Sequence, residues 1–452
     1  MGSSAPVPPI STASAAARRL AVGVLNALPP ESRYALTARM GQGALLLLAV
    51  AVMATRYTIE LQGLFFVYLS LAVLFQLADL GLGYALVQIG SHLAAAGSAG
   101  LRTTFIRQAR ALGTGIALIS LLWIGVGGAA VLHGGTTSSG HDDMLMKTWW
   151  ALAIASATLQ WANLELARLE GLHSAAAAWR TRLQQEWLGG AALVAALVMD
   201  AGLWSLTVQA LARTAVAANA LARYRIPATA HRVDARSLES FSWRREVWPF
   251  QWRIGLSALA GYLIFQAYNP ILLVQQGPAS AGRFGFSLAI MNMLLMVTTA
   301  WPLSQSARWA GWLSQGKRRE AQAAFMRTFR ASSLLAAAAA VSTVFGLALV
   351  QHLGLPLAQR SADLLTTALL LLLGWVHHVV SCVAVLLRAQ RQEPLLVISV
   401  LGALLNALVV FAAANFGQLW VVAAASLAVA LAGLVFTGWL YRCFVAEDVS
   451  KR

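Results

Sequence analysis

The sequence predicts an all-α polytopic membrane protein with about twelve transmembrane helices. Three observations predict this class: 59% of the 452 residues are hydrophobic, only 11% are charged, and long apolar segments recur along almost the whole chain. A soluble domain usually contains about 25% charged residues. A chain with so few charges and so many apolar segments is therefore expected to fold within a lipid bilayer.

Twelve segments approach the length of about 20 apolar residues that a helix needs to cross the hydrocarbon core. The fifth is the weakest, because Glu186 shortens its apolar stretch, and only residues 200–202 separate the fifth from the sixth, which predicts a tight hairpin. The expected spans lie near 36–54, 63–88, 111–132, 149–167, 183–200, 203–222, 254–275, 284–304, 333–352, 364–387, 395–414 and 418–441.

The positions of the basic residues predict the orientation. If the N-terminus is cytoplasmic and the spans alternate, most of the 33 Lys and Arg residues fall in cytoplasmic tails and loops. The expected outer loops hold only Arg56, Lys147, Arg283 and Arg360. Basic loops favour the cytoplasmic side of a membrane, so both termini are expected there. The net charge of +16 then reflects orientation and does not indicate a nucleic-acid partner.

The chain divides into two halves of six helices. We expect a cytoplasmic N-terminal tail (1–35), an N-terminal bundle (36–222), a basic cytoplasmic linker (223–253), a C-terminal bundle (254–441) and a cytoplasmic tail (442–452). Six helices in each half give both halves the same orientation, which indicates a parallel pseudo-twofold repeat. The segments "GLFFVYLSLAVLFQLADLGLG" (63–83) and "GRFGFSLAIMNMLLMVTTAWP" (282–302) occupy equivalent places in the two halves. Transporters built this way hold substrate between their halves.

These features, in this order, resemble the polysaccharide-biosynthesis (Wzx-type O-antigen) flippases of the multidrug/oligosaccharidyl-lipid/polysaccharide (MOP) superfamily. The resemblance rests on "GLFFVYLSLAVLFQLADLGLGYALV" (63–87) and on 282–321, which looks like the family's eighth helix followed by a basic loop. It implies a MATE-like fold. It also implies that the protein flips an undecaprenyl-diphosphate-linked oligosaccharide across a bacterial inner membrane, for O-antigen, capsule or exopolysaccharide.

The same resemblance implies alternating access as the mechanism, and the polymerase and chain-length proteins of the pathway as partners. It implies no cofactor. An inside-negative membrane potential would favour outward movement of an anionic headgroup by about 2.3 kcal/mol per charge per 100 mV. Transport therefore does not require ATP.

One arginine lies inside a predicted span. Arg213 is near the middle of the sixth helix, and Gln209 precedes it by one turn on the same face. Ionisable groups in spans cost about 2.5–3.5 kcal/mol on insertion scales and usually face a cavity. A guanidinium can form two parallel hydrogen bonds with diphosphate oxygens. We therefore expect Arg213 to line a hydrated, positively charged passage between the halves; the alternative is an ion pair with Asp79 or another carboxylate.

Amides in other spans are further candidates for contact with the substrate. These are Gln160 and Asn163 in the fourth helix, and Gln266 and Asn269 in the seventh. Pro270 follows Asn269, frees a backbone carbonyl and favours a kink in the seventh helix. Such breaks often expose polar backbone groups in transporters.

The motif "DLGLG" (79–83) places Asp79 near the cytoplasmic end of the second helix, followed by Gly81 and Gly83. Small residues let helices approach closely. We expect a packing and hinge element at an inner gate, with Asp79 bound to a neighbour's backbone, to an arginine or to donors of the inner loops. The alternative is that Asp79 carries a proton.

His377 and His378 are candidates for ion coupling, because histidine titrates near neutral pH. Adjacent residues on a helix point about 100° apart, so both cannot face one cavity. The alternative is that they form hydrogen bonds between helices.

The remaining charged pairs predict local contacts. Glu165 and Glu186 are expected to pair with Arg168 and Arg182. Cys382 and Cys443 are expected to be free thiols, because two cysteines cannot form a disulfide framework.

Two other classes of function stay open. The first is a MATE-like drug/cation antiporter, which would favour acidic residues in a cavity of the second half. The second is a membrane enzyme, such as a polysaccharide polymerase, ligase or glycosyltransferase, which would place catalytic groups in a large outer loop. The sequence contains no nucleotide-binding loop, nucleophile–base pair or metal-ligand cluster, so an enzyme is not expected.

Overall fold

The computed structural model describes residues 30–96, 99–136, 142–172, 174–224, 243, 247–389 and 395–450, and within these ranges it contains helices and no strand. The predicted linker falls mostly outside them, as does most of the N-terminal tail. The elements are α2 (Pro30–Arg56), α3 (Ile59–Leu77), α4 (Leu82–Ala96), α5 (Ala99–Thr136), α6 (Asp142–Leu172), α7 (Ala175–Val198), α8 (Trp204–Arg223), α10 (Trp248–Phe265), α11 (Tyr268–Gln276), α12 (Pro278–Ser314), α13 (Arg318–His352), η2 (Pro356–Arg360), α14 (Leu364–Arg388), α15 (Leu396–Ala414) and α16 (Leu419–Ser450).

Each predicted span falls on one of these helices or on a pair of them. Within the described ranges, eight helices are long and apolar enough to cross a membrane, and the bent pair α10–α11 would make nine. The other three, α6, α7 and α8, carry polar residues in their middle turns, including Gln160, Glu186 and Arg213. A helix with such residues can cross a bilayer only if they are shielded by neighbouring helices.

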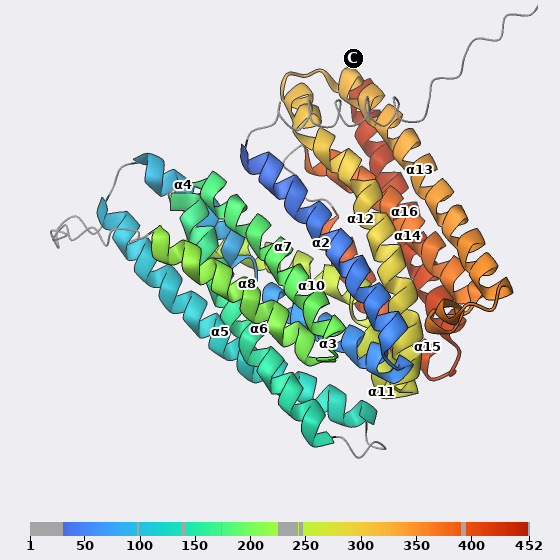
Figure 1. The fold of residues 1–452 in the computed structure, drawn as a ribbon. Helices are drawn as coiled ribbons and strands as arrows, with labels where there is room; N and C mark the ends of the chain where they lie inside the picture. The colour runs from blue at the N-terminus through green and yellow to red at the C-terminus, as the bar shows by residue number, and fades with distance from the viewer. Residues whose placement is uncertain are drawn as a thin grey trace, which may run out of the picture.

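Two groups of helices lie side by side (Figure 1). In the first group, α2 packs on α7, α7 on α8, and α6 on α4, α5 and α8. In the second, α14 packs on α12, α13 and α16, while α15 packs on α10 and α16. The end that holds Tyr57, Gly277 and η2 is the one predicted to face outward, and we call it the outer end. The two groups are spaced more widely at the opposite, inner end, where the C-terminus lies (Figure 1).

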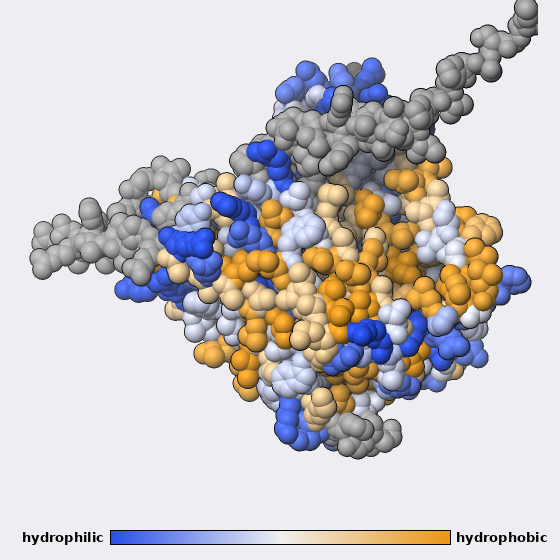
Figure 2. All heavy atoms as spheres, in the orientation of Figure 1, coloured by the Kyte–Doolittle hydropathy of each residue, from blue (hydrophilic) through white to orange (hydrophobic). Residues whose placement is uncertain are grey.

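The surface agrees with a membrane environment. Hydrophobic residues cover much of the middle of the face seen in Figure 2, and hydrophilic residues gather mainly towards its edges. Many large apolar side chains are exposed in the isolated chain, such as Val435, Phe345 and Trp123. So many exposed apolar side chains are expected to be covered by lipid.

Two of the predicted spans are broken. The second span consists of α3 and α4, which are separated at residues 78–81, where Leu80 and Gly81 have positive φ angles of 48° and 83°. The seventh consists of α10 and α11, which meet at an angle of 45°. The predicted break in the seventh span is confirmed. Pro270 lies in the first turn of α11, where the missing amide hydrogen needs no partner.

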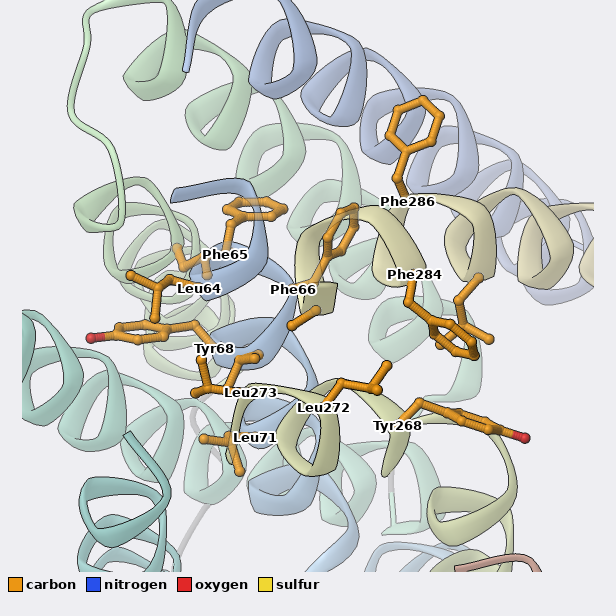
Figure 3. Packing of buried hydrophobic residues seen from close by; sticks show 14 of the residues in the cluster. Leu64, Phe65, Phe66, Tyr68, Leu71, Tyr268, Leu272, Leu273, Phe284 and Phe286 are labelled. Atoms are coloured by element: carbon orange, nitrogen blue, oxygen red, sulfur yellow. The ribbon is translucent and has the colours of Figure 1, made fainter. Parts of the chain in front are cut away.

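The halves meet most closely where α3 crosses α12. A Cβ atom at Gly63 would overlap the carbonyl oxygen of Pro278, and a Cβ at Gly282 would lie 2.5 Å from the carbonyl oxygen of Ile59. These two glycines are the first residues of the repeated segments, so equivalent positions of the two halves touch each other. Beside this crossing, side chains such as Phe66, Tyr268 and Phe284 pack between α3, α11 and α12 (Figure 3).

The crossing predicts a strict requirement for glycine at position 63. Gly63→Ala should lower the free energy of unfolding by about 1–3 kcal/mol, because the added methyl group must push two backbones apart. Thermal unfolding of the purified protein in detergent measures this. Gly346→Ala in α13 is the matched control, since no atom lies within 4 Å of a Cβ built there. Equal melting temperatures for the two variants would contradict the described crossing.

Candidate functional site

A cavity of about 200 Å³ lies between the two groups of helices. Its walls come from α2, α3, α12 and the junction of α10 with α11. Five of its lining side chains are polar and uncharged, and no charged residue lines it; the polar residues are Gln42, Ser70, Gln266, Asn269 and Asn292. Apolar side chains such as Met293 and Met296 separate them.

The break between α10 and α11 positions two of the predicted residues at this cavity. Gln266 ends α10 and Asn269 lies in the first turn of α11, so the bend turns both amides towards the space between the halves. Ser70 of α3 joins them: its hydroxyl donates to Gln266 Oε1 at 3.3 Å and accepts from Asn269 Nδ2 at 3.0 Å. The Asn269 Oδ1 atom is buried and has no partner within the described structure.

Arg213 lies elsewhere. It does not line this cavity, and its guanidinium forms an ion pair with Glu186 of α7, within the first group of helices. Both side chains are about one-fifth exposed, at 21% each. This is the alternative that the sequence left open, an ion pair with another helix's carboxylate. Glu186 was expected to pair with Arg182, but Arg182 pairs with Glu170, while the expected pair of Glu165 and Arg168 forms.

The other predicted amides of the first half form a chain of contacts near Arg213. Asn163 donates to Gln76 at 2.9 Å and accepts from Gln185 at 3.2 Å, and the same Gln185 amide donates to the Arg213 carbonyl oxygen at 3.1 Å. Polar side chains in this bundle therefore bind one another across α3, α6, α7 and α8. They stabilise the packing of the bundle and do not face the cavity between the halves.

Two further candidates belong to the same bundle. Gln160 is buried and accepts from Ser120 at 2.8 Å. Gln209 is half-buried on α8, one turn before Arg213. Neither lines the cavity between the halves.

Asp79 binds the backbone that follows it. Its two carboxylate oxygens accept from the amides of Gly81 at 2.9 Å and Gly83 at 3.0 Å, so it caps the start of α4. The expectation that Asp79 binds a neighbour's backbone or an arginine is wrong for the side chain. The reason is the break in the second span, which exposes amides at the N-terminus of α4. The Asp79 carbonyl oxygen does accept from a neighbour, Gln251 of α10, at 3.4 Å.

The glycines beside Asp79 lie in a contact between the halves. A Cβ at Gly81 would lie 2.8 Å from Ile254, and a Cβ at Gly255 would lie 2.8 Å from Leu80. The start of α4 therefore packs closely against α10 on the inner side of the cavity. Gly83 differs, because its hypothetical Cβ faces the Asp79 carboxylate at 3.0 Å.

The two histidines point in different directions, as their adjacency requires. His377 lines a smaller cavity of about 100 Å³ inside the second group, together with Asn406, Ser399 and Thr437. His378 is fully buried and faces α13, where its Nε2 atom lies 3.2 Å from the Ser332 hydroxyl. Neither histidine reaches the cavity between the halves.

Sequence reasoning missed three residues of that cavity: Gln42, Ser70 and Asn292. Gln42 and Asn292 are single amides within long apolar segments, which is the signal that could have found them. A polar side chain in such a segment is costly unless it faces a cavity or another helix.

The fold is shared with solved transporter structures. An inward-facing multidrug resistance MATE family transporter of the MOP superfamily has a TM-score of 0.64 at 15% identity, covering 90% of this chain and 96% of that one. Lipid II flippase MurJ in an inward closed conformation has a TM-score of 0.61 at 12% identity, covering 91% and 87%. An outward-facing MATE family transporter of the superfamily has a TM-score of 0.56 at 12% identity, covering 95% and 98%.

The chain has the fold of the MOP-superfamily transporters. This confirms the predicted fold class, a two-bundle helical membrane protein of the MATE-like type. No family model and no curated protein matches the sequence. The TM-score is higher for the inward-facing MATE structure than for the outward-facing one.

The ion pair between α7 and α8 predicts a compensating pair of substitutions. Glu186→Gln and Arg213→Gln should each lower the free energy of unfolding by about 1–3 kcal/mol, because each leaves a mostly buried charge without its partner. The double variant should lose less than the sum of the two. Thermal unfolding of all four proteins forms a double-mutant cycle, and strictly additive effects would contradict the pairing.

The cap on α4 predicts a graded effect at position 79. Asp79→Ala removes the acceptor for two amides and should lower the free energy of unfolding by about 1–2 kcal/mol. Asp79→Asn retains one acceptor oxygen and should lose less. Asp143→Ala removes an exposed pair with Lys147 and serves as the control, with little expected change. If Ala and Asn at position 79 are equally stable, the capping role is wrong.

Proposed function

We propose that this protein flips a polyprenyl-diphosphate-linked oligosaccharide from the cytoplasmic to the periplasmic leaflet by alternating access. The observation that carries the proposal is the cavity between the halves, with four amide side chains, one hydroxyl and no charge on its wall. In a transporter of this fold, the space between the halves is where substrate is held. The surface polysaccharide that it serves is O-antigen, capsule or exopolysaccharide.

Amides suit a sugar. Each amide side chain offers both donors and acceptors, which match the hydroxyl and acetamido groups of a glycan. Asn269 already has one buried oxygen without a partner, at the point where α11 begins. A ligand hydroxyl that donates to this oxygen would satisfy a group that is otherwise costly to bury.

The same wall argues against the rival transport function. A drug/cation antiporter needs negative charge where the cation binds, and no carboxylate lines the cavity between the halves. The cavity beside His377 in the second half is also lined without a carboxylate. Binding of neutral carbohydrate is favoured over binding of a cationic drug.

The diphosphate needs a cation, and α2 offers one. Arg39 is exposed and lies three residues before Gln42 and four before Gly43, so the helical repeat places it on the same side of α2 as these cavity residues. It is one turn nearer the inner end. We infer that Arg39 binds the diphosphate. The glycan contacts the amides on the outer side of Arg39, and the prenyl chain stays in the lipid.

The cavity is small for this cargo. A volume of about 200 Å³ is below the roughly 300–1,000 Å³ of pockets that hold drug-sized ligands, and an oligosaccharide is larger still. The halves must therefore separate further at the inner end before the glycan enters. The contacts between α4 and α10 at Gly81 and Gly255 are the ones that would have to part.

Loss of Arg39 tests the proposal. Cells that lack the gene should accumulate lipid-linked oligosaccharide on the cytoplasmic leaflet, and the wild-type gene should restore surface polysaccharide. Arg39→Gln should reduce the initial rate of export about tenfold or more, because a charge-assisted contact is lost, and Arg39→Lys should lie closer to wild type. Lys147→Gln is the control for removal of one basic residue.

A second arm separates the rival functions. If the protein is a drug/cation antiporter, deletion should sensitise cells to cationic drugs and leave the lipid-linked oligosaccharide unchanged. That result, or normal export by Arg39→Gln at equal protein level, would overturn the proposal.

A further inference from the structure

Two of the four basic residues predicted at the outer end form no ion pair with the described part of the chain. Arg56 pairs with Asp200 at 3.8 Å and Lys147 with Asp143 at 2.5 Å, both within the first group of helices. Arg283 of α12 and Arg360 of η2 pair with no carboxylate of the described ranges. Basic residues are disfavoured on the outer side of a membrane protein, so two without partners need a separate reason.

Both arginines belong to the contact that closes the outer end. Gln62 of α3 is 1% exposed, and its Nε2 atom donates to the Gly282 carbonyl oxygen at 2.9 Å and to the Arg360 carbonyl oxygen at 3.1 Å. The Ala362 amide donates to the Arg283 carbonyl oxygen at 3.1 Å. One buried amide of the first half therefore holds together the two backbone segments that carry these arginines.

One nitrogen of the Arg360 guanidinium is buried. Its Nη1 atom is buried and has no hydrogen-bond acceptor in the described parts of the chain. The short helix η2 contacts α2, α12 and α13, so Arg360 belongs to an element that touches both halves. A buried donor without an acceptor is costly, and an anion or water normally satisfies it.

The neighbouring carboxylates do not supply that acceptor. Asp363 follows Arg360 by three residues, but its carboxylate caps α14 by accepting from the Thr366 amide at 3.0 Å. Glu60 lies in the first turn of α3 and forms no ion pair with either arginine. The outer contact between the halves therefore carries positive charge that the described protein does not neutralise.

We propose that Arg283 and Arg360 form an exit-side anion site, which receives the phosphate groups of the cargo when the outer contact opens. The assignment of this anion to the cargo rests on the proposed function. Guanidinium groups bind phosphate oxygens through paired, charge-assisted hydrogen bonds. Opening breaks the bonds of Gln62 and parts the backbones at Gly63 and Gly282, which exposes the buried Nη1 atom of Arg360 to the passage; the side chain of Arg283 is already exposed. Their side chains then stabilise the headgroup at the outer end.

Inorganic pyrophosphate is the probe for the site itself. Its binding to the purified full-length protein in nanodiscs is measured by titration calorimetry, with Gln62→Ala as the background that loosens the outer contact. Substituting both arginines by Gln should weaken binding about tenfold or more, and substituting both by Lys should retain most of it. Lys147→Gln is the matched control and should bind as the background does. Unchanged affinity in the double Gln variant would overturn the site.

Folding does not confound this test. The Gln62 bonds use the backbone of residue 360 and not its side chain, so the melting temperatures of the Gln and Lys variants should match that of the background. If only the double Gln variant has a lower melting temperature, the Lys variant and the two single Gln variants are used for the test. Pyrophosphate affinity that does not depend on the charge at either position refutes the site.

Export measured in cells identifies the ligand. With the wild-type Gln62, the double Gln variant should slow the appearance of lipid-linked oligosaccharide in the outer leaflet. Lost pyrophosphate binding with a normal export rate would overturn the assignment of the site to the cargo and leave the proposed function intact. If wild-type protein exports no such lipid but the arginines still bind pyrophosphate, the proposed function fails while the anion site stands.

Discussion

Two backbones approach each other at Gly63 of α3 and Gly282 of α12 more closely than any side chain would allow. This crossing joins the halves at the outer end, and the buried amide of Gln62 fastens it by binding Gly282 and Arg360. With the outer ends held together, the halves can diverge only at the inner end. The cavity lies on the inner side of the crossing, between α2, α3, α11 and α12, and its position follows from that constraint.

The breaks in two spans place polar groups and backbone where a straight helix could not. A continuous seventh span would satisfy its own backbone and present a smooth apolar face, whereas the bend between α10 and α11 turns Gln266 and Asn269 into the cavity. The break between α3 and α4 lets the following backbone pack against α10 at Gly81. The Asp79 carboxylate then satisfies the amides that this break leaves open. Both breaks lie on helices at the contact between the two halves.

The sequence predicted what depends on periodicity and local chemistry. Long apolar segments indicated the helices, the repeat indicated that Gly63 and Gly282 are equivalent, and Pro270 indicated the break beside it. The partners of polar side chains were harder to predict, because they depend on how the helices are rotated against one another. Glu186 pairs with Arg213 and not with Arg182, since the hairpin of α7 and α8 brings residues 27 positions apart together. Gln42 and Asn292 were missed: a lone amide in an apolar segment indicates a cavity or a helix contact, but it does not show which of the two the side chain faces.

The uncharged wall of the cavity has an electrical consequence. The residues that line the cavity carry no formal charge, so they move none across the membrane field when the empty carrier resets. If the cargo is the anionic lipid proposed above, the loaded step carries its charge through the membrane field, and the inside-negative voltage favours that step in the direction of export. Membrane voltage would then accelerate delivery of the cargo, and the cavity residues would add no charge that slows the return of the empty carrier.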